Sequence, residues 1–172
     1  TSASGSLITT NNSGAGATVI LLADNMSLGD AIAAGNGLVT LAPNLAASSI
    51  QVGSGATDAT GQLGITDVEL DLITTTGGVT IGHVANSGGI TVVGAADQAT
   101  AASITGGIFT LQTGSGNIAI NAATSNDIAT TVTTASGNIS FGAAGAISTT
   151  NDNVILTATS GAIQGNAAAL TN

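Results

Sequence analysis

The sequence contains no lysine and no arginine, and it also lacks cysteine, tryptophan and tyrosine. Nine acidic residues therefore give a net charge of −9 at neutral pH. Proteins that bind nucleic acids contact the phosphates with lysine and arginine, so we exclude nucleic acid as a partner. An anionic membrane surface would repel the chain for the same reason. No arginine–carboxylate pair can form, so we expect stability to come from backbone hydrogen bonds and aliphatic packing.

The other absences narrow the class of protein further. Without cysteine there can be no disulfide scaffold and no zinc–thiolate site, although the compartment is not fixed by this. Apolar residues nevertheless make up 43% of the chain, which is enough for a folded core. The longest apolar runs, such as residues 19–23, are far shorter than the ~20 residues of a membrane-spanning helix, so we expect no membrane insertion.

The 172 residues are predicted to form one domain. Residues 37–165 carry the clearest repeats, and residues 1–36 match them less well, as divergent terminal units would. Thr1 opens directly into polar, glycine-containing sequence. We therefore expect either that a leader has been removed or that this is an excerpt from a longer chain.

A short unit recurs along the chain: glycine or asparagine, then alternating aliphatic residues, then a turn of small residues. The clearest match pairs residues 113–120 with residues 134–141, at an offset of 21 residues. Within these units Ile118 and Ile120 would point inward, as would Ile139 and Phe141. This alternation predicts strands with one buried face. Two strand signals in each ~20-residue period predict an all-β fold, a parallel β-helix (β-solenoid) of ~20-residue rungs.

Two segments depart from this rhythm. The 18-residue step from Ile90 to Ile108 predicts a loop insertion around residues 95–102. Residues 27–34 carry a weak helix-capping pattern and are the one plausible helix, limited by Gly29 and Gly35 to about two turns. A filament-forming β-sandwich has much the same composition and stays open as the alternative fold.

The segments 111–118 and 137–147 resemble the repeats of filamentous-haemagglutinin-like proteins, which are β-strand-repeat bacterial surface adhesins. Members of that family have right-handed parallel β-helix shafts and are exported by two-partner secretion or as autotransporters. The resemblance covers residues 37–165 and is one of composition and rhythm. It implies that the β-helix is right-handed and that the location is extracellular or at the cell surface, and it supplies no catalytic residues.

Enzymes that act on polysaccharides also use parallel β-helices. Lyases of this fold generally need a lysine or arginine, and glycosidases need two carboxylates ~5–10 Å apart, usually beside aromatic rings. Asp67, Glu69 and Asp71 alternate with Val68, Leu70 and Leu72, so we expect the carboxylates on one outer strand face. They are read as a solvated face, with a calcium contact as the alternative. No catalytic residue and no cofactor is expected, and the chain is interpreted as a non-enzyme.

The remaining polar candidates are few. His83 is the only imidazole and is read as a surface or packing residue near a turn. Sequons at Asn11, Asn25 and Asn138 permit N-glycosylation where the host has the machinery. Threonine runs at residues 74–76 and 130–134 are explained by β-propensity with a solvated face, and outward hydroxyl ladders are the alternative.

We expect a structural and adhesive extracellular protein, a rod or filament segment of a bacterial surface adhesin or fibre. The open ends of a short β-helix expose backbone groups that need partners. They are expected either to join copies end to end in a homopolymer or to continue into a longer chain. The alternative function is a module that binds a glycan, a host receptor or ice on one flat face.

Overall fold

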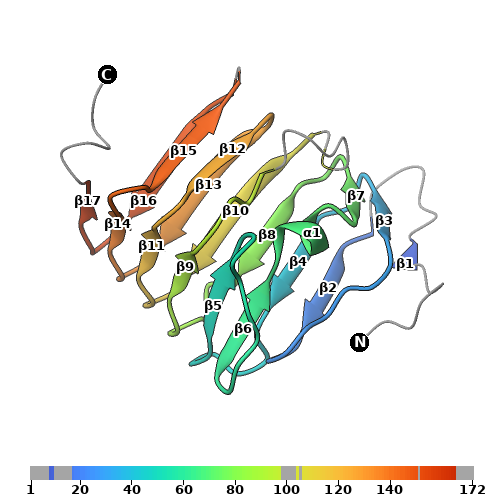
Figure 1. Ribbon diagram of the computed structural model, residues 1–172, viewed down its shortest axis with the longest axis horizontal. Helices are drawn as coiled ribbons and strands as arrows, with labels where there is room; N and C mark the ends of the chain where they lie inside the picture. Colours follow the sequence, from blue (N-terminus) through green and yellow to red (C-terminus); the bar gives the residue numbers. More distant parts are fainter. Residues whose placement is uncertain (1–7, 10–16, 98–103, 105, 151, 166–172) are drawn as a thin grey trace.

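The computed structural model describes residues 8–9, 17–97, 104, 106–150 and 152–165. The described part is nearly all β, and its one helix is the short α1 (Asp67–Leu70). No helix in this part is long and apolar enough to cross a membrane. Figure 1 shows that the chain advances along the long axis of the molecule, from blue strands at one end to red strands at the other.

The strands form four sheets. Sheet A holds, in spatial order, β1 (Ile8–Thr9), β3 (Ile32–Gly35) and β7 (Ile73–Thr75). Sheet B holds β16 (Val154–Ala158), β13 (Ala129–Thr134), β10 (Ile108–Thr113), β8 (Val79–Gly82), β4 (Val39–Ala42) and β2 (Val19–Leu22). Sheet C holds β17 (Ile163–Gln164), β14 (Ile139–Phe141), β11 (Ile118–Ile120), β9 (Ile90–Val92), β5 (Ser49–Val52) and β6 (Gln62–Ile65). Sheet D holds β12 (Ala123–Asn126) and β15 (Ala146–Thr149).

Every pairing between these described strands is parallel. Except for β5 and β6, which belong to one pass, neighbouring strands in a sheet come from successive passes of the chain. A complete pass visits sheet B, then sheet C, then sheet A or D. We call one such pass a rung. This topology is compatible with a β-solenoid. It does not support the β-sandwich alternative, because sandwiches are built from antiparallel sheets.

The strongest repeat of the sequence corresponds to one rung. Ile118 pairs with Ile139, 21 residues later, and Ile108 pairs with Ala129 at the same offset. Rungs built on β10 and β13 contain three strands each, one more than the two strand signals of the sequence indicated. The missed strands, β12 and β15, have the sequences ATSN and AIST, whose small polar residues give little strand signal.

The second rung is much longer, because the chain leaves the sheets after β5. It returns as β6, which pairs with β5 and lies at one edge of sheet C, out of chain order (Figure 1). It then forms α1 before entering β7. Val39 consequently pairs with Val79, its equivalent in the next rung, 40 residues later.

Two predictions of local structure are wrong. Residues 67–71 are not a strand: Thr66 and Glu69 form a capping box that starts α1, so the three carboxylates lie on and after a helical turn. Val68, expected inward, is 71% exposed, whereas Leu70 is buried as expected. Residues 27–34 are not a helix either, since residues 27–29 have no regular structure and Ile32 begins β3. Gly29 and Gly35 limit helix formation there, and pairing with β7 supplies the alternative.

The core consists of aliphatic side chains stacked from rung to rung. One such ladder runs along sheet C, with each member in register with the next: Leu63, Ile50, Ile90, Ile118, Ile139 and Ile163. All but the last are fully buried. The predicted alternation is confirmed at Ile118 and Ile120, which are buried around half-buried Ala119. Phe141 is only partly buried, and it packs against the same core.

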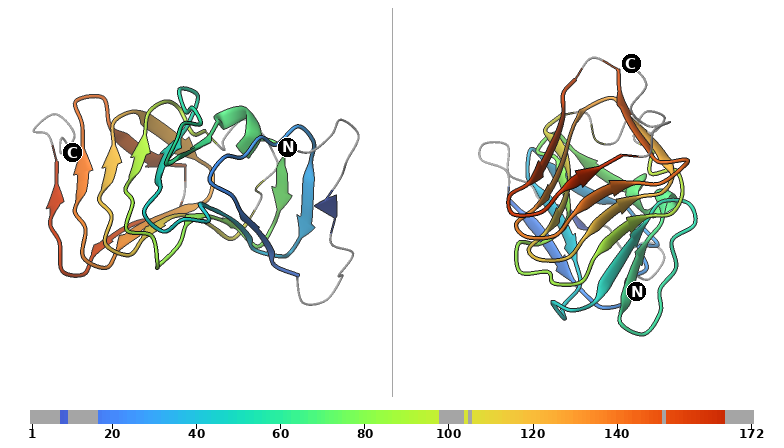
Figure 2. Two further views of the ribbon diagram at one scale, coloured as in Figure 1. Left: turned by 90° about the horizontal axis from the view of Figure 1, so that it is seen from below. Right: turned by 90° about the vertical axis from the view of Figure 1, so that its left-hand side faces the viewer.

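The N-terminal segment and the predicted insertion can be followed in part. β2 and β3 pair with β4 and β7, so the divergent residues 17–36 belong to the same sheets as the repeats. Of the predicted insertion at 95–102, residues 95–97 are described and residues 98–102 lie outside the described part. Figure 2 shows the sheets around one interior, and the buried residues of sheets A, B and C form one hydrophobic cluster.

The two ends of the described stack differ in burial. At the β2 and β6 end, Val19 is 8% exposed and Leu63 is fully buried. At the β16 and β17 end, Val154 is 39% and Ile163 50% exposed, although both continue inward-facing ladders. The core side chains at the first end are therefore covered, whereas the second end presents core side chains on its surface.

A candidate binding groove on the outer face of sheet B

The outer face of sheet B carries exposed aliphatic side chains. Ile20 is 59% and Leu22 is 56% exposed on β2, and Ile108 is 44% and Ile155 49% exposed on β10 and β16. Side chains alternate between the two faces of a strand, and the inward partners of Ile20 and Leu22 are Val19 and Leu21. Outward positions in sheet C are instead small or polar, such as Gln51, Thr91 and Ala119.

A row of threonines crosses this outer face. Thr40, Thr80, Thr110 and Thr131 are consecutive partners in β4, β8, β10 and β13. The row ends at Ile20 on one side and at Ile155 on the other. It gives one hydroxyl per strand, spaced by the ~4.8 Å that separates paired strands. Of the two predicted threonine runs, only residues 130–134 contribute to this row, through Thr131. Thr75, Thr130 and Thr134 are instead buried, each 1% exposed.

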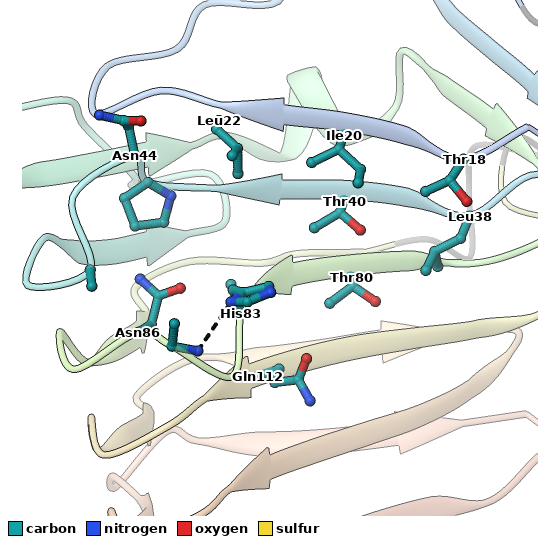
Figure 3. A pocket seen from close by; sticks show the side chains of 14 residues that line it. Thr18, Ile20, Leu22, Leu38, Thr40, Asn44, Thr80, His83, Asn86 and Gln112 are labelled. Carbon is teal, nitrogen blue, oxygen red and sulfur yellow. Dashed lines mark hydrogen bonds between the residues drawn. The ribbon is translucent and has the colours of Figure 1, made fainter.

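A groove of about 510 Å³ lies over the β2, β4 and β8 part of this face (Figure 3). Two loops that follow β4 and β8 form its wall at one end. Its lining consists of Thr18, Ile20, Leu22, Leu38, Thr40, Pro43, Asn44, Ala46, Thr80, Gly82, His83, Ala85, Asn86 and Gln112. The loops also carry Leu45 and Val84, which are 59% and 61% exposed beside the lining residues. The groove thus has an apolar edge at β2, Thr40 and Thr80 on its floor, and a more polar wall at the loops.

His83 is the first residue after β8 and lies exposed in this wall. Its Nδ1 accepts a hydrogen bond from the backbone N–H of Ala85, at 3.0 Å. In the neutral imidazole the proton must then sit on Nε2, which leaves Nε2–H as a donor. The sequence prediction of a surface residue near a turn is confirmed, and its place in the groove wall is new.

Asn86 is the most unusual polar residue of the groove. Its side chain is 2% exposed, and its Nδ2 has no hydrogen-bond partner among the described residues. The rest of the residue is held firmly: its backbone N–H donates to His83, and its backbone carbonyl accepts from Gly114 and Ser115. A buried amide nitrogen without an acceptor costs about 1–3 kcal/mol. Such a group in a groove wall is a reason to look for a ligand.

The groove is free of formal charge when His83 is neutral. None of the lining residues is acidic, and the chain has no lysine or arginine. All nine acidic residues are described, and all lie outside the strands. One of them, Asp24, is bonded to the loop after β4: its Oδ1 accepts hydrogen bonds from the Leu45 N–H and the Ser48 hydroxyl.

The structure uses two of the three predicted calcium candidates as hydrogen-bond acceptors. Glu69 accepts from the Thr66 N–H and hydroxyl through Oε2, and from the Leu28 N–H through Oε1, all within 2.9 Å. Asp67 Oδ1 accepts from the Asp97 N–H at 2.7 Å. Asp71 is exposed at the C-cap of α1. Within the described ranges no three histidine, aspartate or glutamate side chains gather as a metal site.

The ionised form of Asp71 is destabilised by the neighbouring carboxylates of Asp67 and Asp97. Although the residue is exposed overall, slight burial of its carboxyl raises the pKa above the ordinary value of 3.8, and the nearby carboxylates of Asp67 and Asp97 raise it further. Its place at the C-terminal end of α1 is also unfavourable for a negative charge. Nothing in its surroundings compensates with a positive charge, because the chain has no lysine or arginine.

Two of the three glycosylation candidates are described. Asn25 is exposed in a bend after β2, and Asn138 is exposed before β14. Asn138 Oδ1 accepts a hydrogen bond from the Ala162 N–H of the next rung at 2.8 Å. Asn11 lies outside the described residues.

Sequence reasoning missed the groove altogether. Its lining residues come from four rungs, because Gln112 of β10 joins those around β2, β4 and β8. The sequence of β2, Val-Ile-Leu-Leu, is aliphatic throughout and does not show which residues face outward. The one available signal was that β2 is aliphatic throughout, whereas most of the other described strands carry polar or small residues at their outward positions. No known protein family, curated protein or solved structure matches the chain.

Proposed function

We propose that this chain is a structural segment of an extracellular rod or fibre, of the kind that bacterial surface adhesins use as shafts. The finer fold that goes with this proposal is a right-handed parallel β-helix. The observation that carries it is the in-register stacking of equivalent residues in successive rungs, from Ile50 to Ile163 in sheet C and from Leu21 to Leu156 in sheet B.

Such stacking suits a mechanical role. Each rung is tied to the next by parallel backbone ladders on more than one side, and its interior is filled with aliphatic side chains. Rungs contact only their neighbours, so stability accumulates along the axis and length can grow without a new kind of core. The proposal includes the absence of catalysis, which is supported by a composition without lysine, arginine, cysteine, tryptophan or tyrosine.

The exposed end of the stack supports assembly along the axis. Val154 and Ile163 continue buried ladders yet are 39% and 50% exposed. The edges of β16 and β17 are the outermost of sheets B and C in the described stack. Parallel edge strands with aliphatic side chains are templates for a further strand. The added rung would come from a second copy of the chain or from its continuation.

Electron microscopy of the native, undigested material, with intact mass on the same sample, tests this proposal. Long filaments made of chains near 16 kDa would support end-to-end assembly. Thin rods made of a far heavier chain would support a shaft segment. Compact, monodisperse 16 kDa particles would contradict both versions.

For a filament, Ile163→Asp is the informative variant, since it places a charge where the next rung would stack. Val84→Asp adds the same charge at a 61% exposed loop position and serves as the control. We expect filaments to shorten or disappear with the first variant and to persist with the second. Equal behaviour of the two would contradict assembly through this end.

A further inference from the structure

We propose that the sheet B groove binds a small uncharged ligand that has an apolar flank and an oxygen able to accept hydrogen bonds. This inference is independent of the proposed rod or fibre, because the groove lies on the side of the stack and not at its ends. It concerns the lining residues of β2, β4 and β8 and the loops after β4 and β8 (Figure 3).

The apolar part of the argument rests on exposure. Ile20, Leu22 and Leu38 are 59%, 56% and 37% exposed. Ile20 and Leu22 lie along β2 at one edge of the groove, and Leu38 lies just before β4 at one end of it (Figure 3). A ligand that covered these side chains would gain binding free energy of roughly 25 cal/mol per Å² of apolar surface removed from water. A concentration of exposed aliphatic side chains around one hollow is a mark of a binding surface.

The polar part rests on two side chains in the opposite wall. His83 offers an Nε2–H donor, because its Nδ1 is occupied by the Ala85 N–H. The Asn86 side chain offers an amide whose nitrogen, Nδ2, has no acceptor among the described residues. In Figure 3 the two side chains lie next to each other, with the amide oxygen of Asn86 toward His83. Rotation of this terminal amide exchanges its nitrogen and oxygen, so the amide can turn its donor toward a ligand.

The charge of the ligand follows from what the groove lacks. An anion would meet no lysine or arginine and would approach a chain of net charge −9. A cation would find no carboxylate among the lining residues. A neutral molecule is therefore the occupant that the groove accommodates best. The volume of about 510 Å³ falls within the ~300–1,000 Å³ of small-molecule sites.

Three fluorescent probes separate these features in titrations of the full chain. Prodan is neutral and carries a ketone oxygen, N-phenyl-1-naphthylamine is neutral without a carbonyl, and 1-anilinonaphthalene-8-sulfonate is the second probe with an added sulfonate. We expect saturable one-to-one binding of prodan with a blue-shifted emission. The naphthylamine should bind about fivefold more weakly, which is the net effect of one hydrogen bond. The sulfonate should bind more weakly still.

Variants then place the site. Leu22→Glu adds a carboxylate to the exposed apolar edge and should weaken prodan binding at least about tenfold, whereas Ile155→Glu, on the same face but far from the groove, should leave it within about twofold. Asn86→Ala removes the unpaired amide and should weaken prodan about fivefold while leaving the naphthylamine unchanged. Circular dichroism checks that each variant is folded. If Asn86→Ala does not fold, the two glutamate variants decide alone.

Three results would overturn the inference: no saturable prodan binding, equal effects of Leu22→Glu and Ile155→Glu, or binding of the sulfonate as tight as that of its neutral parent. None of these results bears on filament or rod formation, which electron microscopy reads separately.

Discussion

Asn117 and Asn138 stack on each other in successive rungs, and Oδ1 of Asn117 accepts a hydrogen bond from the backbone N–H of Asn138 at 2.8 Å. Asn138 repeats the interaction with the N–H of Ala162, also at 2.8 Å. Each asparagine thus satisfies a backbone donor of the following rung, at the corner where sheet B passes into sheet C. The ladder stops at position 162, where alanine has no side-chain acceptor.

We expect Asn117→Ala to lower the free energy of unfolding by about 0.5–1.5 kcal/mol, because the Asn138 N–H loses its acceptor. Asn117→Asp keeps an oxygen in the same place and should restore most of the loss. Urea denaturation of the two variants measures the difference. If alanine and aspartate destabilise the chain equally, the hydrogen bond does not contribute to stability as inferred.

The glycines that precede these asparagines also stack. A Cβ on Gly137 would lie inside van der Waals distance of the Gly116 carbonyl, and Gly161 stands in the same relation to Gly137. Neither backbone can move away without breaking the ladder of the sheet. Gly137→Ala should therefore destabilise the chain by about 1–3 kcal/mol or more. Ser136→Ala, at the exposed neighbour, should change stability by less than about 0.5 kcal/mol. A similar small effect of both would show that the corner relaxes easily.

Much of the fold could be predicted from such short repeats. The 21-residue offset identified the register of β11 with β14, and the alternation around Ala119 identified its buried face. Both follow from the two-residue period of a strand, which is a local property of the sequence. The same local reasoning failed at residues 67–71, where the alternation of acidic and aliphatic residues is also compatible with a helical turn. There the capping box of Thr66 and Glu69 decided the outcome.

The groove could not be predicted in this way. Ile20, Leu38 and Thr80 become neighbours only through the pairing of β2 with β4 and of β4 with β8. Between β4 and β8 the chain also forms β6 and α1. No repeat in the sequence indicates how long this added segment is. The unpaired nitrogen of Asn86 likewise depends on how two loops pack. To predict a site whose residues come from stacked rungs, one must know the strand register of every rung that contributes to it.

The isoleucine ladder of sheet C allows a matched test of the stack. Ile118 is fully buried in its middle and Ile163 is 50% exposed at its end. Ile118→Ala should cost about 2–5 kcal/mol through lost burial and the cavity left behind, and Ile163→Ala less than about 1 kcal/mol in the isolated chain. Chemical denaturation at low protein concentration measures both. A large cost at Ile163 under these conditions would show that this end is covered in solution.

The acidic cluster beside α1 predicts a dependence of stability on pH. Burial, Asp67 and Asp97 raise the pKa of Asp71 above 3.8, so the folded state holds this proton more tightly than the unfolded state does. As the pH rises through the interval between 3.8 and the raised value, the unfolded chain loses the proton first and the free energy of unfolding falls. Above that interval the ionised carboxylate destabilises the fold. Asp71→Asn, which resembles the protonated acid, should therefore be more stable than the parent chain at pH 7.

The difference between Asp71→Asn and the parent should shrink as the pH falls and vanish near pH 3, where the carboxyl is protonated in both states. Asp152→Asn changes the net charge by the same amount at an exposed position remote from α1 in the sequence, and it controls for the overall charge of the chain. Urea denaturation of the three proteins at pH 7 and pH 3 provides the comparison. If Asp152→Asn stabilises the chain as much as Asp71→Asn does, the effect belongs to the net charge of −9 and not to the cluster with Asp67 and Asp97.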